Sequence, residues 1–174
     1  MIRRLPFALL AVASLALPAA QEVPLEYRIK AAYLYNFVKY VEWPGPVPDS
    51  IVICVAGQNP FGTVLEDMIR NERVRGIPLR SVVIPGPIDD CHVVFTPRTS
   101  RVPVYLKAVT GTPTLTVGET DNFIELGGMI NFFLVEGKIV RFEINRAAAE
   151  RVNLRISTRL LQLARLAEPR TDKP

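Results

Sequence analysis

The segment Gly57 to Thr63, with the sequence GQNPFGT, has two glycines at the spacing of a phosphate-binding loop. Such a loop cradles nucleotide phosphates with its backbone N–H groups, and a lysine after the second glycine reaches the β- and γ-phosphates. Thr63 stands where that lysine is required, which argues against nucleotide hydrolysis. The favoured interpretation is an ordinary strand-to-helix turn. The alternative is a small-ligand or anion site at the end of a strand, formed by Gly57, Asn59, Phe61 and Gly62.

His92 lies close to Asp89 and Asp90 and suggests acid–base chemistry. Adjacent carboxylates before a strand more often end a turn, and a single histidine at a strand start is usually packed or solvated. A nucleophilic Cys54 would need a thiolate, whose formation is suppressed inside an apolar run. No serine occurs in a GxSxG pattern. We therefore predict that the protein is not an enzyme and uses no cofactor.

The composition narrows the class of protein. The 174 residues are 49% hydrophobic and 22% charged, which is typical of one globular domain. One histidine and two cysteines are too few for a structural zinc site, which takes about four such ligands, so we expect no metal. The formal net charge of +4 at first suggests nucleic-acid binding.

The first 20 residues resemble a secretory signal peptide, with a basic start, an apolar stretch from Leu5 to Leu17 and small residues before Gln21. Removing Arg3 and Arg4 leaves 19 of the 21 basic residues against 17 acidic ones, a net charge of +2. We therefore expect no nucleic-acid partner. No later stretch reaches the roughly 20 apolar residues of a membrane span, so we expect an exported, soluble product without membrane insertion after signal removal.

A long helical pattern runs from Leu25 to Trp43 and carries two apolar rows. The first row, at spacings of four and three, is expected to face a core and comprises Tyr27, Ala31, Leu34, Val38 and Val41. The second row falls on a separate face and comprises Ile29, Tyr33, Phe37 and Tyr40. The favoured interpretation is a helix buried between a sheet and neighbouring chain. The alternative is that the second row binds a partner protein or a second subunit.

The remaining pattern alternates short strands with helices. Strands are expected at 51–57, 81–84, 92–95 and 114–117, and helices at 59–70, after Ser100, from Asn145 to Val152 and after Ser157. The stretch 129–145 predicts a β-hairpin around Glu136 and Gly137. We therefore predict a single α/β domain over residues 21–167, with a mixed, mostly parallel sheet, helices on both faces, a C-terminal hairpin and terminal helices, followed by a polar tail at 168–174.

The two cysteines of an exported protein favour a disulfide between Cys54 and Cys91 over two free thiols. Cys54 lies within one predicted strand and Cys91 directly before another, so neighbouring strands would bring them together. Closing this loop is expected to stabilise the fold by about 4 kcal/mol.

Six ordered blocks carry a resemblance to the YfiR family: KAAYLYNFVKYVEWP at 30–44, ICVAGQNPFG at 53–62, CHVVF at 91–95, GGMINFF at 127–133, RFEIN at 141–145 and ISTRLLQLA at 156–164. The resemblance implies a periplasmic α/β protein, often a homodimer. It also implies binding to the periplasmic sensor region of an inner-membrane diguanylate cyclase, whose repression lowers cyclic di-GMP and biofilm formation. Cys54 and Cys91 match one family cysteine pair, whereas a second pair is absent. The alternative function is a periplasmic small-molecule-binding module of another signalling or transport system.

Overall fold

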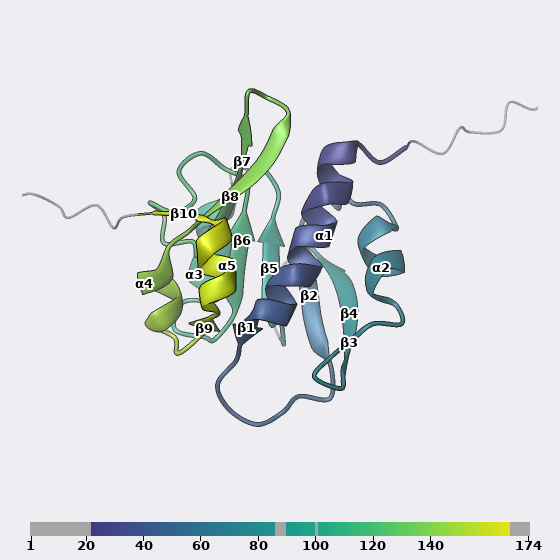
Figure 1. Ribbon diagram of the computed structural model, residues 1–174, viewed down its shortest axis with the longest axis vertical. Helices are drawn as coiled ribbons and strands as arrows, with labels where there is room; N and C mark the ends of the chain where they lie inside the picture. Colours follow the sequence, from purple (N-terminus) through teal and green to yellow (C-terminus); the bar gives the residue numbers. More distant parts are fainter. Residues whose placement is uncertain (1–21, 86–89, 100, 168–174) are drawn as a thin grey trace, which may run out of the picture.

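A computed structural model describes residues 22–85, 90–99 and 101–167, so the expected signal peptide and the polar tail lie outside the described residues. The domain is built on an eight-stranded mixed sheet (Figure 1). From one edge to the other its strands are β10 (Arg165–Leu166), β8 (Ile139–Ile144), β7 (Ile130–Val135), β6 (Leu115–Gly118), β5 (Val93–Thr96), β2 (Ile51–Ala56), β4 (Ile77–Ile84) and β3 (Arg73–Val74). The five strands from β7 to β4 are parallel, which confirms the predicted mixed, mostly parallel sheet.

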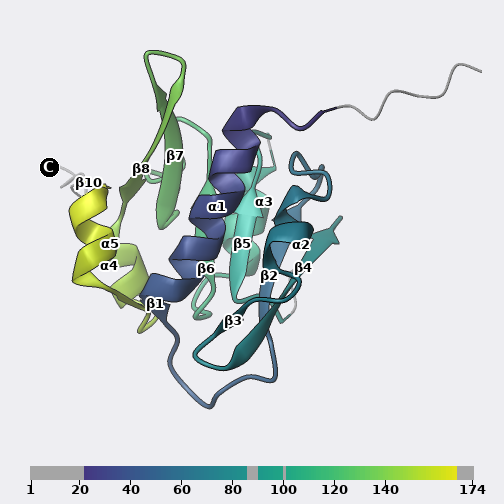
Figure 2. The same ribbon diagram turned by 45° about the vertical axis from the view of Figure 1, so that its right-hand side comes forward.

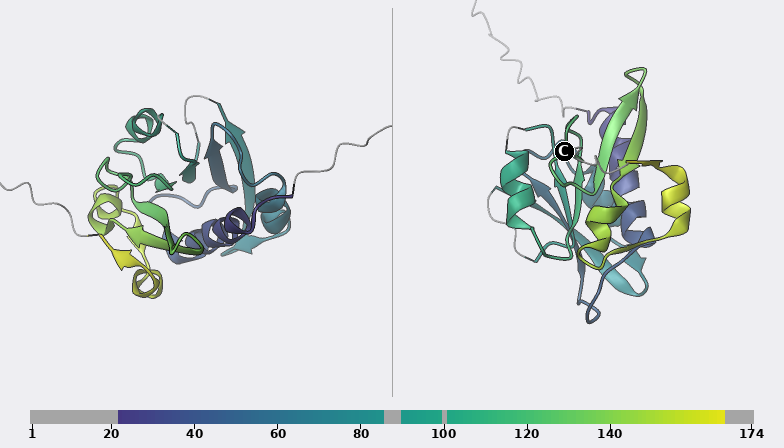
Figure 3. Two further views of the ribbon diagram at one scale, coloured as in Figure 1. Left: turned by 90° about the horizontal axis from the view of Figure 1, so that it is seen from above. Right: turned by 90° about the vertical axis from the view of Figure 1, so that its left-hand side faces the viewer.

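Helices cover both faces of this sheet, as predicted. The helices are α1 (Leu25–Tyr40), α2 (Val64–Ile69), α3 (Val102–Ala108), α4 (Arg146–Glu150) and α5 (Thr158–Leu163). Seen from above, α1 and α3 lie on opposite sides of the sheet (Figure 3). Strand β2 is buried on both faces because Ile53 belongs to the core under α1 while Cys54 belongs to the smaller core under α3. This double burial explains the continuous apolar run of that strand.

Helix α1 is shorter than its sequence pattern. It ends at Tyr40, and the next two residues form β1 (Val41–Glu42), which pairs antiparallel with β9 (Arg155–Ile156). The expected helix at 59–70 is also shorter, because turns occupy the residues before α2. At β1 pairing with a distant strand replaces helical hydrogen bonds, and before α2 local turns replace them. Apolar periodicity reports neither change.

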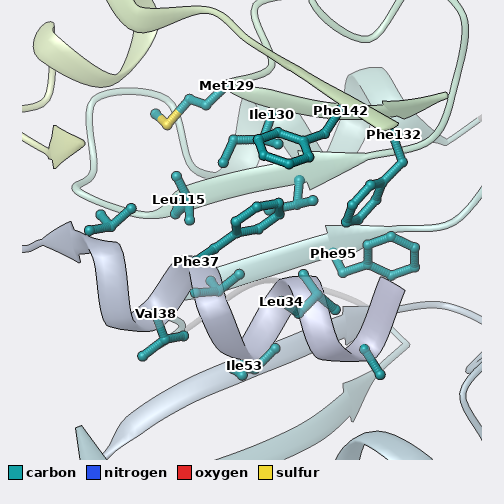
Figure 4. Packing of buried hydrophobic residues seen from close by; sticks show 14 of the residues in the cluster. Leu34, Phe37, Val38, Ile53, Phe95, Leu115, Met129, Ile130, Phe132 and Phe142 are labelled. Carbon is teal, nitrogen blue, oxygen red and sulfur yellow. The ribbon is translucent and has the colours of Figure 1, made fainter. Parts of the chain in front are cut away.

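Phe37 is a core residue, so the prediction that placed it on a partner-binding face is wrong. Its side chain is fully buried, and its ring stacks on Phe132 at 5.7 Å and meets Phe142 edge-on at 5.1 Å between centroids (Figure 4). The physical reason is that β7 and β8 pack against the flank of α1, so the helix has core contacts on two sides. Of the other three members of that row, Ile29 is exposed, and Tyr33 and Tyr40 are partly exposed.

The segment between β6 and β7 is held by Phe123, whose ring is fully buried. A Cβ atom added to Gly118 would lie 2.3 Å from this ring, and one added to Gly128 would lie 2.2 Å from it. Both glycines are therefore required for close approach of the ring. This contact fixes the chain that leaves the end of β6 and returns to the start of β7.

The C-terminal elements follow the sequence prediction. The hairpin turns at Glu136 and Gly137, which both have positive φ angles. Asn145 caps α4 by accepting a hydrogen bond from the Ala148 N–H at 3.1 Å. Ser157 caps α5 by accepting from the Leu160 N–H at 3.3 Å. The expected hairpin and the expected helix starts at Asn145 and Ser157 are confirmed, and each start is marked by an N-cap.

The predicted disulfide is present. Cys54 on β2 and Cys91 directly before β5 are bonded, with 5.9 Å between their Cα atoms and a sequence separation of 37. Both residues are buried in the core under α3. Because β2 and β5 are neighbouring strands, the bond ties the start of β5 to β2.

We predict that replacing both cysteines by alanine lowers the free energy of unfolding by about 2–5 kcal/mol, because the loop that the bond closes becomes free in the unfolded chain. Chemical denaturation of the mature protein measures this loss. Reducing agent should destabilise the wild-type protein and leave the Cys54→Ala/Cys91→Ala variant unchanged. Two free thiols in non-reducing peptide maps of the native protein would contradict the prediction.

Candidate functional site

The order of the strands reverses direction between β2 and β5. From β2 the chain passes through α2 to β4 on one side, whereas β5 lies on the other side and leads through α3 to β6. Open α/β sheets bind ligands at such a reversal, outside the carboxyl ends of the strands. The loop after β2, the chain after β5 and the start of α1 meet there and line a hollow of about 400 Å³. This is the first candidate site.

The loop after β2 is closed by its own hydrogen bonds. The Asn59 side chain donates to the Gly62 carbonyl at 2.8 Å and accepts from the Phe61 N–H at 2.9 Å. Gly57 and Gly62 adopt positive φ angles, which glycine permits at low cost. These bonds support the favoured interpretation that the loop is a strand-to-helix turn.

The predicted ligand-loop residues do not all reach the hollow. Asn59 lines it, whereas Phe61 is fully buried against Phe95, with 4.9 Å between ring centroids. Placing Phe61 in a ligand loop is therefore wrong, because its ring anchors the turn to the core. Gly62 lines a separate hollow beside β4, and a ligand for Gly57, Asn59 and Gly62 stays a prediction.

A buried ion pair, absent from the sequence predictions, includes Glu119, which lines the first hollow. Lys30 on α1 lies with its Nζ 2.5 Å from Oε2 of Glu119, which follows β6, and both side chains are 4% exposed. Lys30 also pairs with Glu26 one turn earlier. Glu119 Oε1 accepts hydrogen bonds from the Tyr27 hydroxyl at 3.1 Å and the Arg98 N–H at 3.0 Å. We call Tyr27, Lys30 and Glu119 the α1 clamp.

The polar groups of the α1 clamp find their partners within the protein: Lys30 and Glu119 have opposite charges, and the Tyr27 hydroxyl donates to Glu119. Burial, followed by the charge and hydrogen bond of Glu119, raises the pKa of Tyr27 to about 12, so its hydroxyl remains a donor at physiological pH. Both oxygens of Glu119 accept hydrogen bonds from the protein. The arrangement joins the first turns of α1 to the carboxyl ends of β5 and β6. Its geometry indicates anchoring rather than proton transfer to a substrate.

His92 has a structural role at the amino end of β5, opposite the carboxyl end at which the first hollow lies. Its Nδ1 accepts a hydrogen bond from the Val52 N–H at 3.2 Å, and its carbonyl accepts from the Trp43 indole at 3.2 Å. Burial, with a contribution from the charge of Arg80, lowers the pKa of His92 below its ordinary value of 6.5. The neutral ring is thus the form that fits, because a protonated Nδ1 cannot accept the Val52 hydrogen bond.

The structure also bears on the cysteine, carboxylate and metal chemistry considered from the sequence. Cys54 carries no thiol, since it is disulfide-bonded, and Asp90 is exposed, while Asp89 lies outside the described residues. Within 22–85, 90–99 and 101–167, no three histidine, cysteine or acidic residues gather as a metal site would need. In the same ranges, none of the helices has the length and apolar character to cross a membrane.

We predict that Lys30→Met lowers the free energy of unfolding by about 3–5 kcal/mol, because it leaves Glu119 buried without its cation. Urea denaturation measures the loss. The matched control is Arg146→Met, which removes the exposed pair with Glu150 and should change stability by at most about 1 kcal/mol. Lys30→Met/Glu119→Gln should recover part of the stability. Equal effects of Lys30→Met and Arg146→Met would show that the α1 clamp does not anchor the helix.

We also predict that stability falls on acidification through His92. The lowered pKa means that the unfolded chain takes up a proton first, so stability decreases as the pH drops below about 6.5 and levels off once the folded His92 is protonated. His92→Gln offers an acceptor that does not titrate and should flatten this step. Melting curves between pH 7.5 and 4.5 compare the two proteins. A step of unchanged size in the variant would assign the pH dependence to other groups.

Comparison with known proteins agrees with this architecture. A family model described as YfiR/HmsC-like matches residues 27–165. A solved structure of a conserved domain protein from Vibrio cholerae O1 biovar El Tor strain N16961 is similar in fold, with a TM-score of 0.54 and 14% sequence identity. The similarity covers 79% of this chain and 60% of that one, so the chain spans less than two thirds of the length of that protein. No curated protein matches the sequence. Since the family match extends from the third residue of α1 to β10, the chain belongs to the YfiR/HmsC-like family.

Proposed function

We propose that the protein is a non-catalytic periplasmic regulator that binds the periplasmic sensor region of an inner-membrane diguanylate cyclase and holds that enzyme inactive. The observation that carries this proposal is the family match, which covers almost the whole described domain. Under this proposal residues 1–20 direct export and are removed, and the mature protein lowers cyclic di-GMP and biofilm formation without chemistry of its own.

The use of the reactive side chains supports a binding function. Cys54 is consumed in the disulfide, His92 accepts a backbone hydrogen bond, and Lys30 is held between two carboxylates. Each of these three groups contributes to the fold. What the described chain offers a partner is therefore surface rather than a reactive centre.

The proposed docking surface joins α1 to the hairpin. Tyr33 on α1 is half-buried, and its ring meets Phe142 at 5.2 Å and Phe132 at 5.9 Å between centroids. One helical turn earlier, Ile29 is 36% exposed. Two residues after Phe132, on the same face of β7, Leu134 is 39% exposed.

Ile29 lies in the first half of α1, Tyr33 at its middle, and Leu134 near the turn of the hairpin. The start of α1 and the turn of the hairpin are both at the same end of the molecule (Figures 1 and 2). We call Ile29, Tyr33 and Leu134 the α1–hairpin face. It keeps two members of the row predicted from sequence and replaces the buried Phe37 with a hairpin residue. Exposed apolar side chains backed by a packed aromatic core are typical of protein-binding surfaces.

The free edge of the main sheet supports the expectation of a homodimer. In the described chain, only Ile77 and Pro78 of β4 have a strand partner on the outer side, in β3. The following residues of β4 include Val82 and Val83, which are 39% and 49% exposed. An unprotected apolar edge strand is a ready template for pairing with another strand. We propose that a second copy occupies this edge, away from the α1–hairpin face.

Binding regulates the cyclase only if it discriminates between states. The protein must bind the inactive state more tightly than the active one, and a tenfold preference corresponds to about 1.4 kcal/mol. Losing one or two apolar anchors at the centre of an interface typically removes at least that much. Aspartate at two positions of the α1–hairpin face is therefore expected to abolish regulation.

We predict that Ile29→Asp/Leu134→Asp weakens binding to the cyclase at least tenfold and raises cyclic di-GMP in cells, while the melting temperature stays within a few degrees of wild type. The mature protein is used to capture the cyclase from membranes, and cyclic di-GMP is measured in a deletion strain carrying each variant. The control is Val104→Asp, which alters a 57%-exposed valine on α3, across the sheet. It should repress like wild type.

Oligomeric state is measured in the same series by light scattering, so loss of partner binding is separated from loss of self-association. A folded Ile29→Asp/Leu134→Asp protein that represses fully would contradict the assigned face. A deletion strain with unchanged cyclic di-GMP would contradict the proposed function itself.

A further inference from the structure

A groove of about 550 Å³ lies between α3 and α4, apart from both the α1 clamp and the α1–hairpin face. Its lining residues come from α3, from the segment before β7 and from the end of α4. The apolar part includes Leu106, Val109, Met129 and Val152. Val109 and Met129 are buried and make the floor, whereas Leu106 and Val152 are partly exposed. The size falls within the range of small-ligand sites, about 300–1,000 Å³.

The charge of the groove has one sign. Lys107 on α3 and Arg151 after α4 both line it, and its lining contains no acidic residue. The ion pairs found among the described residues include neither of these two cations. Glu150, the neighbour of Arg151, is already paired with Arg146. Two cations thus flank an apolar floor without an acid to neutralise them.

A buried hydroxyl adds a hydrogen-bond donor to the same groove. Thr116 on β6 is 4% exposed and accepts a hydrogen bond from the Met129 N–H at 3.0 Å. Within the described chain its own hydroxyl hydrogen has no acceptor, although a threonine hydroxyl donates as well as accepts. A buried donor left without an acceptor is unfavourable, and a ligand oxygen would satisfy it.

We propose that this groove binds a small organic anion with an apolar body. Its carboxylate or similar group lies between Lys107 and Arg151, and its apolar part covers Val109, Met129 and Val152. A protein segment fits less well, because a stable protein interface buries about 800 Å² on each partner and the hollow is confined to one ligand-sized space. The proposal rests on the groove alone and goes beyond the proposed regulation of a cyclase.

The test uses the fluorescent probe 8-anilinonaphthalene-1-sulfonate, which combines an aromatic body with one negative charge, and the full mature protein. We expect saturable binding at one site. Lys107→Gln/Arg151→Gln should weaken it at least tenfold. The matched control, Arg141→Gln/Arg159→Gln, removes the same charge from two exposed arginines elsewhere and should leave binding within twofold of wild type. Thermal melting confirms that each variant is folded.

Two further measurements locate the probe. The uncharged analogue N-phenyl-1-naphthylamine should bind wild type and the Lys107→Gln/Arg151→Gln variant equally, since only the anion uses the cations. The sequence has three methionines, so removal of Met1 with the signal leaves Met68 and Met129 as methyl signals in an NMR spectrum. The sulfonate probe should shift the Met129 signal and leave Met68 unchanged.

Three outcomes would overturn the proposal. The first is probe binding that is equal in wild type and the Lys107→Gln/Arg151→Gln variant. The second is a probe that shifts Met68 and not Met129. The third is a Met129 signal that ignores the probe and shifts with the cyclase sensor region, which would assign the groove to a protein partner. Since none of these readouts depends on cyclic di-GMP, failure of the groove proposal and failure of the proposed function are distinguishable.

Discussion

The burial of Phe37 between α1 and the C-terminal hairpin sets the rotation of α1, and much of the structure depends on that rotation. Residues seven apart lie on the same side of a helix, so the rotation that buries Phe37 also turns Lys30 toward the sheet. A buried ammonium requires an anion, and Glu119 supplies it at 2.5 Å from the end of β6. The segment after Glu119 is in turn fixed by the Phe123 ring between Gly118 and Gly128. One aromatic contact thereby ties the first helix to both halves of the sheet.

The opposite face of the sheet is stabilised by different means. Its core is small, and the helix that covers it, α3, has seven residues. The disulfide from Cys54 to Cys91 and the hydrogen bond from Val52 to His92 both join β2 to the start of β5 on or beside this face. A covalent bond and a neutral histidine thus reinforce the side on which apolar burial is least. The chemistry that looked reactive in the sequence is concentrated where the fold needs support.

The sequence predicts the elements whose signals are local. The buried strand β2, the hairpin and the caps at Asn145 and Ser157 depend on periodicity, turn residues and side-chain hydrogen bonds that short segments carry. The two-residue strands β1, β9 and β10 escape prediction because each exists only through a distant partner, as when Val41 pairs with Ile156. The two apolar rows of α1 are ambiguous for the same reason, since a helix with core on two sides has no single apolar face.

The α1 clamp shows how a charge within an apolar row predicts a buried ion pair. Lys30 lies three residues after Tyr27 and four before Leu34, both members of the row assigned to the core, so its spacing places a cation among buried positions. Glu119 directly follows a buried strand and is the complementary signal. The pairing itself is not readable from the sequence, because 89 residues separate the partners. Only the assembled sheet brings them together.

The groove and the α1–hairpin face are connected through β7. Met129 lies on the floor of the groove, and the next residue begins β7, which leads to Leu134 near the hairpin turn. The base of the hairpin is held on two sides, because the Met129 N–H donates to Thr116 and its carbonyl accepts from the Asn145 N–H at 2.8 Å. A ligand on Met129 therefore contacts the base of the element whose far end is proposed to contact the cyclase. Linkage makes such coupling reciprocal: a ligand that strengthens partner binding by a given factor is itself bound more tightly by that factor when the partner is present. A ligand with equal affinity for the free and partner-bound forms would change nothing, however tightly it bound.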